Sequence, residues 1–149
     1  MSTRLTAKDA KQSLTSHAAA RGDEIRAKYG PQIGWSELLR LLQDRACVRY
    51  PVGIAFDASA LLPGEVAYPA PNGERPEDGF TLHLHPLFAS DLDRVPYLAL
   101  YQLAAVNYGP FASPDDAETF AAAALGLDKE AYYQAICRLA DQLQEPGCA

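Results

Sequence analysis

The stretch Leu98-Ala99-Leu100-Tyr101-Gln102-Leu103-Ala104-Ala105-Val106 decides how this chain folds. Wound into a helix, it carries apolar side chains on every face, whereas a helix on a protein surface keeps one polar face. We therefore predict a helix from about Val95 that is buried all round and forms the spine of the domain. Asp93 is placed to cap this helix, and Pro96 is tolerated in its first turn.

The residues after this helix predict two more. Ser113-Pro114-Asp115-Asp116 combines a capping serine, a proline at the first helical position and acids that favour the positive end of a helix dipole. Gly126 ends that helix, and Asp128 is placed to cap a last helix that runs to about Leu143.

The first third of the chain is predicted to be helical. Apolar residues spaced by three and four indicate a helix over residues 5–29, and a leucine-rich helix over 36–44 follows, with Ser36 as its N-cap. With the elements after it, this predicts a single α+β domain. A small, mostly antiparallel sheet is expected to pack against about five helices.

The strands of that sheet are predicted from alternation. Apolar and polar residues alternate over 48–56 and 80–85, and Pro51 places the first of these strands at a sheet edge or a bulge. Residues 57–79 are rich in proline and glycine and predict a long loop, with a short strand at 65–68.

Bulk composition excludes several classes of function. The chain has 149 residues, enough for one domain, and its net charge of −6 argues against nonspecific binding to nucleic acid or to an anionic membrane. No apolar run is long enough to span a bilayer, and no secretory signal is present at the N-terminus. Cys47, Cys137 and Cys148 are odd in number and widely spaced, which fits a reducing cytosol better than a disulfide scaffold.

Two runs carry a resemblance to a known family. Asp116-Ala117-Glu118-Thr119-Phe120-Ala121-Ala122-Ala123-Ala124-Leu125 is similar to the third-ligand helix of the ImmA/IrrE-type gluzincins, and Phe80-Thr81-Leu82-His83-Leu84-His85-Pro86-Leu87 resembles the strand beside the active-site cleft of small zincins. The resemblance implies a zincin-like core. It divides the chain into a helical N-terminal part, that core, a C-terminal helix and a tail (1–44, 45–127, 128–143 and 144–149).

The zinc chemistry of that family is missing from this chain. On the zincin pattern His-Glu-x-x-His, Tyr101 falls on the first His, Gln102 on the catalytic Glu and Ala105 on the second His. Glu118 matches the third ligand, and it alone of the four is a normal zinc ligand. Because an amide takes up no proton near neutral pH, Gln102 cannot act as a general base. The resemblance therefore implies a former active site with no metal or other cofactor, in which the Tyr101 hydroxyl bonds to Glu118.

Further candidate residues lie on either side of that site. His83 and His85 point the same way on a strand, and an acid such as Glu118 could complete a metal site with them. The alternative is a pair of histidines on the polar face of an edge strand. Asn107 and Tyr108 are candidates for contact with a ligand or a partner at the former cleft.

These patterns lead us to expect a non-catalytic protein-binding or adaptor module in the cytoplasm. Its partner would be a protein or peptide held in the emptied cleft, or along an exposed strand by β-augmentation. Two alternatives stay open. One is an enzyme of unknown chemistry that uses Glu118 with Tyr101 or His85, and the other is a structural subunit that self-associates as a homodimer.

Overall fold

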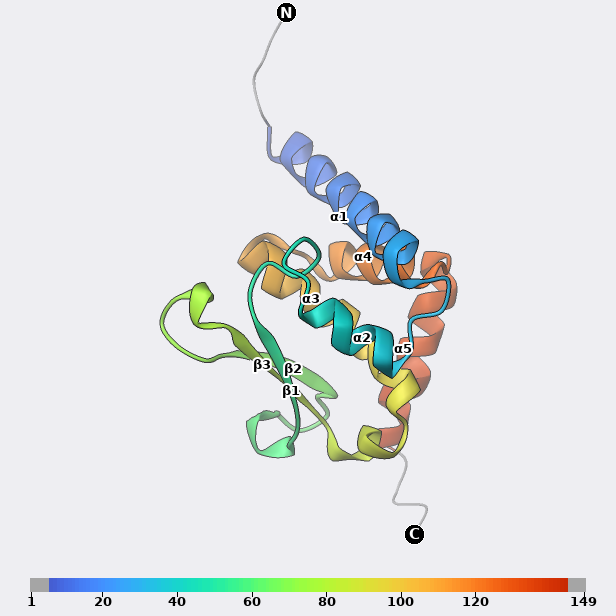
Figure 1. Ribbon diagram of the computed structural model, residues 1–149. Coiled ribbons are helices and arrows are strands. Elements are labelled where there is room, and N and C mark those ends of the chain that lie inside the picture. Colours follow the sequence, from blue (N-terminus) through green and yellow to red (C-terminus); the bar gives the residue numbers. More distant parts are fainter. Residues whose placement is uncertain (1–5, 145–149) are drawn as a thin grey trace, which may run out of the picture.

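The computed structural model describes residues 6–144, in which five α-helices and three strands form the α+β fold that the sequence predicts (Figure 1). The helices are α1 (Ala7–Tyr29), α2 (Trp35–Leu42), α3 (Val95–Tyr108), α4 (Pro114–Leu125) and α5 (Lys129–Gln144). The strands are β1 (Val52–Phe56), β2 (Ala67–Pro71) and β3 (Phe80–Leu84), and short 3₁₀ turns connect several of these elements.

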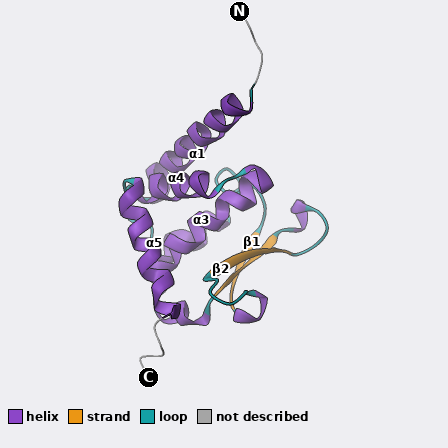
Figure 2. Ribbon diagram, turned by 180° about the vertical axis from the view of Figure 1, so that it is seen from behind, coloured by secondary structure: helices purple, strands orange, loops and turns teal. Residues whose placement is uncertain are grey.

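Helix α3 lies at the centre of the fold, as its apolar sequence predicts. It packs against β2 and β3 on one side and against α4 on the other, and α1 crosses α4. Figure 2 shows the sheet on one side of α3 and the remaining long helices on the other. Most side chains of α3 are buried, among them Leu98, Leu100 and Leu103.

The crossing of α1 over α4 is unusually close because of one glycine. A Cβ added at Gly22 would lie 2.5 Å from the Phe120 carbonyl oxygen and 2.6 Å from the Ala123 Cβ. Ala18, one turn before Gly22, is fully buried in the same crossing region. Small residues therefore let the backbones of α1 and α4 approach each other.

The sheet is mixed, with the strand order β1-β3-β2. β1 runs parallel to β3 and β2 runs antiparallel to it, so β3 is the central strand and the other two are edges. Pro51 precedes an edge strand, as predicted. The prediction for residues 48–51 was wrong, because they form turns and bends in place of strand.

The predicted short strand at 65–68 is β2, displaced along the chain to Ala67–Pro71. It lies in the proline-rich segment that the sequence predicts as a loop. Its pairing with β3 adds the third strand of the sheet.

Two predicted helix caps were wrong. Helix α2 begins one residue before Ser36 and has Gly34 as its N-cap, whose backbone N–H donates to Glu37 Oε1 at 2.8 Å. Helix α3 follows a 3₁₀ turn, and its N-cap is Arg94. Asp93 instead accepts a hydrogen bond from the Trp35 backbone N–H at 3.3 Å, which joins the start of α3 to α2.

The caps predicted around α4 are confirmed. Ser113 accepts from the Asp116 backbone N–H and Asp116 accepts from the Ser113 backbone N–H, which is a complete capping box. Gly126 follows α4 with a φ of 70°, a conformation that favours glycine. Asp128 then accepts from the Ala131 backbone N–H at 2.8 Å at the start of α5.

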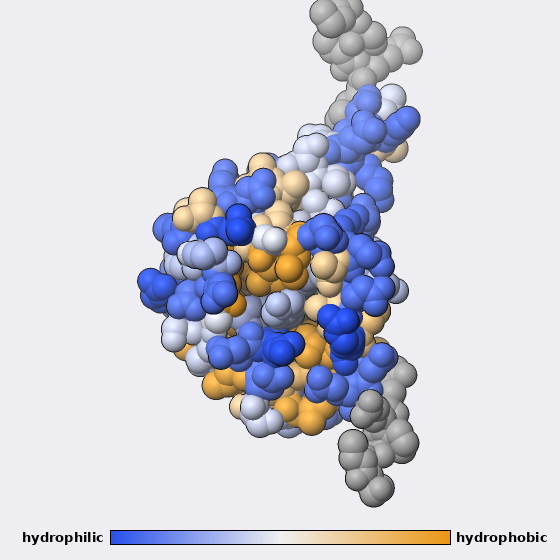
Figure 3. All heavy atoms as spheres, turned by 90° about the vertical axis from the view of Figure 1, so that its right-hand side faces the viewer, coloured by the Kyte–Doolittle hydropathy of each residue, from blue (hydrophilic) through white to orange (hydrophobic). Residues whose placement is uncertain are grey.

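The surface is unevenly polar. In the face shown in Figure 3, the part of α1 that projects beyond the body of the domain is mostly hydrophilic, and hydrophobic residues come to the surface in separate patches below it. Among the helices of residues 6–144, none combines the length and the apolar character that crossing a membrane requires.

Candidate functional site

The first candidate site is the outer edge of β1. Every second residue of β1 directs its backbone N–H and C=O groups toward β3. The strand register shows this, as do two bonds at the ends of the strand. The Phe80 N–H donates to the Pro51 carbonyl, and the Asp57 N–H donates to the Leu84 carbonyl. The backbone N–H and C=O groups of Val52, Ile54 and Phe56 then point outward. We call these six groups the β1 edge. None of them has a hydrogen-bond partner among the described residues.

The opposite edge of the sheet differs in one respect. The bonds from the Asn72 N–H to the Gly79 carbonyl and from the His85 N–H to the Val66 carbonyl turn Ala67, Pro69 and Pro71 of β2 outward. Proline has no N–H, so two of the three outward residues of β2 cannot donate to a further strand. Of the two edges, that of β1 is therefore the one that keeps all of its outward N–H donors.

Apolar side chains lie beside the β1 edge. Ile54 and Phe56 are partly exposed, and the Trp35 ring of α2 lies 6.1 Å from the Phe56 ring, centroid to centroid. Leu39, one helical turn after Trp35, is 42% exposed. A strand added to β1 would therefore find both backbone hydrogen-bonding groups and apolar surface.

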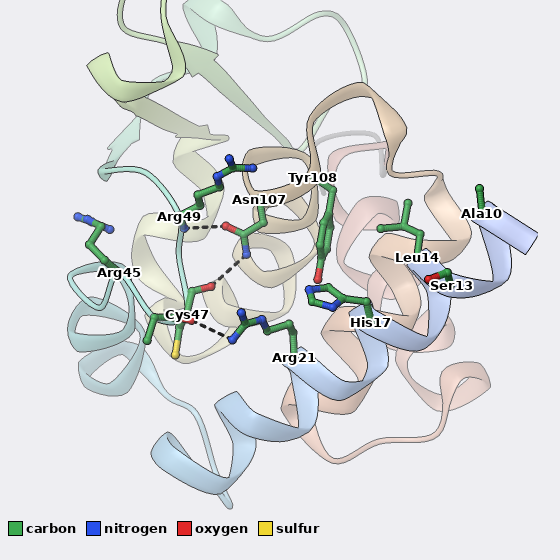
Figure 4. Close-up of a pocket in the computed structure, with 11 residues that line it drawn as sticks. Ala10, Ser13, Leu14, His17, Arg21, Arg45, Cys47, Arg49, Asn107 and Tyr108 are labelled. Carbon is green, nitrogen blue, oxygen red and sulfur yellow. Dashed lines mark hydrogen bonds between the residues drawn. The ribbon is translucent and has the colours of Figure 1, made fainter. Parts of the chain in front are cut away.

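The second candidate site is a pocket of about 730 Å³ between α1, the segment 45–49 and the end of α3 (Figure 4). We call it the cationic pocket. Its polar lining consists mainly of His17, Arg21, Arg45, Arg49, Asn107 and Tyr108, and Leu14 of α1 contributes an apolar wall.

Asn107 fixes one wall of the cationic pocket. Its side-chain oxygen accepts from the Arg49 backbone N–H at 2.9 Å, and its side-chain nitrogen donates to the Cys47 carbonyl at 3.0 Å (Figure 4). The Asn107 amide thus satisfies one backbone N–H and one backbone carbonyl of the irregular segment 45–49, which a neighbouring strand would otherwise have to do. Asn107, which the sequence suggests as a ligand contact, has both amide ends engaged in the fold.

Arg45 explains why the predicted strand does not begin at Val48. One nitrogen of its guanidinium donates to the carbonyls of Leu42, Val48 and Tyr50, at 3.2, 3.0 and 3.2 Å. These bonds curl the chain after α2 around the Arg45 side chain. The alternating pattern over 48–51 is therefore overridden by a tertiary contact.

Asp44 anchors the start of the same segment. Hydrogen bonds from the Lys28 ammonium, the Tyr29 hydroxyl and the Ala46 backbone N–H hold the pKa of its carboxyl far below the ordinary value. Burial, together with the negative charge of Asp44, raises the pKa of the Cys47 thiol to about 11. Cys47 is therefore a packed, protonated thiol at neutral pH.

Tyr108 carries the unusual hydroxyl of the cationic pocket. The oxygen is buried and has no hydrogen-bond partner among residues 6–144, and burial raises the pKa of Tyr108 to about 12. The exposed His17 ring packs edge-on against the Tyr108 ring, with the centroids 5.5 Å apart. The phenol therefore stays protonated at neutral pH and keeps its capacity to donate.

Positive charge gathers at this pocket although the chain as a whole carries −6. Arg21 is paired with Glu24 at 2.9 Å and also donates to the Ala46 carbonyl. No salt bridge joins Arg45 or Arg49 to an acid within the described part of the chain, and the Arg49 guanidinium lies over the Tyr50 ring at 5.2 Å. No local sequence pattern predicts this cluster, because Arg21 is far along the chain from Arg45 and Arg49.

A second cavity of about 600 Å³ continues the cationic pocket along α1. It shares Leu14, Arg49 and Tyr108 with the first and reaches Phe111, which is 81% exposed. Asp116, also on its lining, is 1% exposed. Burial alone would raise the pKa of Asp116, but hydrogen bonds from Ser113 and Thr15 lower it overall.

The predicted former active site is assembled only in part. Burial, and then the charge of nearby Glu118, raise the pKa of Tyr101. Among the hydrogen bonds of residues 6–144, none joins these two side chains as predicted. Gln102 is partly buried and Ala105 is exposed on α3. None of these four side chains lines the cationic pocket or its continuation.

The two histidines have separate surroundings. His83 lies on the central strand β3, so the predicted placement on an edge strand was wrong, and its buried Nδ1 has no partner among the described side chains. His85 lies just beyond β3, where its Nδ1 accepts from the Leu87 backbone N–H at 3.1 Å. Within residues 6–144, no three histidine, cysteine or acidic side chains are grouped so that they could hold a metal ion.

Comparison with family models, with curated proteins and with solved structures found no match to this chain. The zincin-like resemblance of residues 45–127 therefore stays a prediction from sequence.

Proposed function

We propose that this chain is a non-catalytic protein-binding module of the cytoplasm that holds an extended segment of a partner protein on its β1 edge. The observation that carries the proposal is the row of outward N–H and C=O groups on Val52, Ile54 and Phe56. Exposed strand edges of this kind are templates for pairing with another chain.

The chain protects one sheet edge and leaves the other open. Pro69 and Pro71 remove outward donors from β2, which is a common way of preventing unwanted pairing. No comparable device is present on β1, whose outward residues are all non-proline. This contrast favours β1 as a functional edge.

The surroundings of the β1 edge supply affinity as well as register. Backbone hydrogen bonds contribute about 0.5–1.5 kcal/mol each, so three to six of them need help from apolar contacts. Ile54 and Phe56 of the strand, and Trp35 beside Phe56, offer such contacts. We therefore expect the partner segment to carry apolar side chains at alternate positions.

On this proposal, the zincin-like scaffold of residues 45–127 is a pseudoenzyme. In the alignment on the zincin pattern, Gln102 and Ala105 replace residues on which zinc hydrolysis depends. Such a scaffold would retain binding while lacking the catalyst.

The test starts from peptides selected from a random display library against the full chain. We expect the selected peptides to bind with alternating apolar residues, and binding to fall at least tenfold in Ile54→Pro. Proline at this position removes an outward donor and blocks the approach of a strand, while the β1–β3 ladder uses the residues on either side. Ile54→Val, which keeps the N–H, is the matched control.

Two results would contradict the proposal. One is equal binding of the selected peptides to Ile54→Pro and to Ile54→Val, with both variants folded by circular dichroism. The other is a concentration-dependent dimer in sedimentation that Ile54→Pro abolishes, which would assign the β1 edge to a second copy of this chain.

A further inference from the structure

The cationic pocket lies apart from the β1 edge and is not used by the proposed function. It combines three arginines, from α1 and from the segment 45–49, with an apolar wall and a buried hydroxyl. The backbone N–H groups of residues 46–49 are already engaged, since they donate to Asp44 or Asn107. Recognition in this pocket therefore has to come from side chains.

We propose that the cationic pocket binds a small organic phosphate ester, with the phosphate held by Arg21 and Arg49 and the organic part lying against Leu14 and Tyr108. This site is independent of strand addition at β1.

Arginine geometry supports an oxyanion as the ligand. A guanidinium presents paired N–H donors that match the oxygens of a phosphate, and such charge-assisted bonds are about twice as strong as neutral ones. Arg49 has an exposed side chain with no acidic partner in the described chain, and its contact with the Tyr50 ring leaves the N–H donors at the guanidinium edge available. A second cation, Arg21, faces the same pocket from α1 (Figure 4).

The charge of the pocket favours a dianion over a monoanion. Arg21, Arg45 and Arg49 together bring three positive charges to its lining, and Glu24 offsets one of them through its pair with Arg21. A phosphate monoester carries close to two negative charges near neutral pH. A carboxylate would leave part of this positive charge unmatched.

The size and lining of the pocket favour an ester over free phosphate. A cavity of about 730 Å³ is much larger than one inorganic ion, and it continues past Leu14 toward the exposed Phe111. Tyr108 lines both cavities and extends the apolar wall that begins at Leu14. An organic group on the phosphate would cover this wall.

The experiment measures binding of four probes to the full chain by ¹H–¹⁵N NMR titration. Phenyl phosphate is the test ligand, inorganic phosphate lacks the organic part, phenylacetate replaces the phosphate by a carboxylate, and benzyl alcohol lacks the charge. We expect phenyl phosphate to bind at least tenfold more tightly than each of the others and to shift the signals of Arg49, Asn107 and Tyr108. Binding should weaken as ionic strength rises.

The variant Arg49→Gln removes one charged donor whose side chain makes no hydrogen bond to the rest of residues 6–144. It should weaken phenyl phosphate binding about tenfold, which is the effect of one charge-assisted hydrogen bond. Arg138→Gln, at an exposed position on α5, removes the same charge away from the pocket and should leave binding unchanged.

Three results would overturn the inference: absence of shifts at millimolar phenyl phosphate, equal binding of phenylacetate, or equal losses in Arg49→Gln and Arg138→Gln. The last of these would show attraction to overall charge in place of a site.

Discussion

Replacing Gly22 by alanine tests the packing on which the helical half of this fold depends. Alanine is the better helix former by about 1 kcal/mol, so helix propensity alone predicts that the variant gains stability. Packing predicts the opposite, because the new Cβ would lie 2.5 Å from the Phe120 carbonyl oxygen and 3.0 Å from the Ala124 backbone nitrogen. Backbone atoms cannot rotate away, so α1 and α4 would have to separate by about 1 Å to reach a normal contact distance.

We expect the cost of overpacking to exceed the gain in helix propensity. Overpacking of a tight interior costs about 1–3 kcal/mol, and separating the helices also weakens the contacts of their buried neighbours, Ala18 and Ile25 on α1 and Ala121 and Ala124 on α4. The net loss should be about 2 kcal/mol, which lowers the midpoint of thermal unfolding by roughly 4–8 °C for a domain of this size.

Chemical and thermal unfolding followed by circular dichroism measure this change. The control is Ala20→Gly, at an exposed position of α1, whose loss of stability reports the helix-propensity term in the same helix. A Gly22→Ala variant that is more stable than the parent, by about the amount that Ala20→Gly loses, would show that the α1–α4 crossing is not as close as described.

Three further predictions concern residues around the cationic pocket. Hydrogen bonds lower the pKa of the Asp44 carboxyl in the folded chain. Its contribution to folding stability is therefore complete above the unfolded pKa of about 3.9 and is lost as the pH falls below that value. In denaturant titrations at decreasing pH, the stability of Asp44→Asn should decline less steeply than that of the parent chain. Thr15→Val removes the hydroxyl that donates to Asp116 at 2.7 Å, which should cost about 1–3 kcal/mol in urea unfolding because that carboxylate is 1% exposed; no loss would mean that other groups satisfy it. Cys47 is buried and its pKa is raised to about 11, so iodoacetamide should alkylate it more slowly than the partly exposed Cys137 in the folded chain. Peptide mass spectrometry measures both rates. Equal rates would contradict the burial of Cys47.

Local patterns were enough to predict the helices. The all-round apolar sequence of α3 predicted its central position, and the serine and acids before α4 predicted a capping box that the structure contains. These signals lie within a few residues of the structure they determine. Sequence reasoning failed where the deciding contact comes from elsewhere, as at Asp93, which bonds to Trp35 of α2 and does not cap α3.

The sheet shows the same limit. The alternation over 48–56 is genuine, but Arg45 binds the carbonyls of Val48 and Tyr50, and the strand begins at Val52. The parallel pairing of β1 with β3 depends on β2 lying on the far side of β3, which no local pattern encodes.

The candidate sites were predictable only in part. Asn107 and Tyr108 were identified from sequence as contact residues, and the structure places both on the cationic pocket. The sequence predicts that they contact a ligand in a cleft shared with Tyr101 and Glu118, but neither Tyr101 nor Glu118 lines the cationic pocket. Arg21 and Arg49 were missed, because their proximity arises from the packing of α1 against a loop that follows α2.

Amide hydrogen exchange along β1, with and without a selected peptide, tests the central claim most directly. In the free chain, the outward amides of Val52, Ile54 and Phe56 should exchange much faster than those of Gly53 and Ala55, which donate to β3. Bound peptide should slow exchange at the three outward amides and remove the alternation. Protection at other sites, while those three amides continue to exchange as in the free chain, would contradict the account.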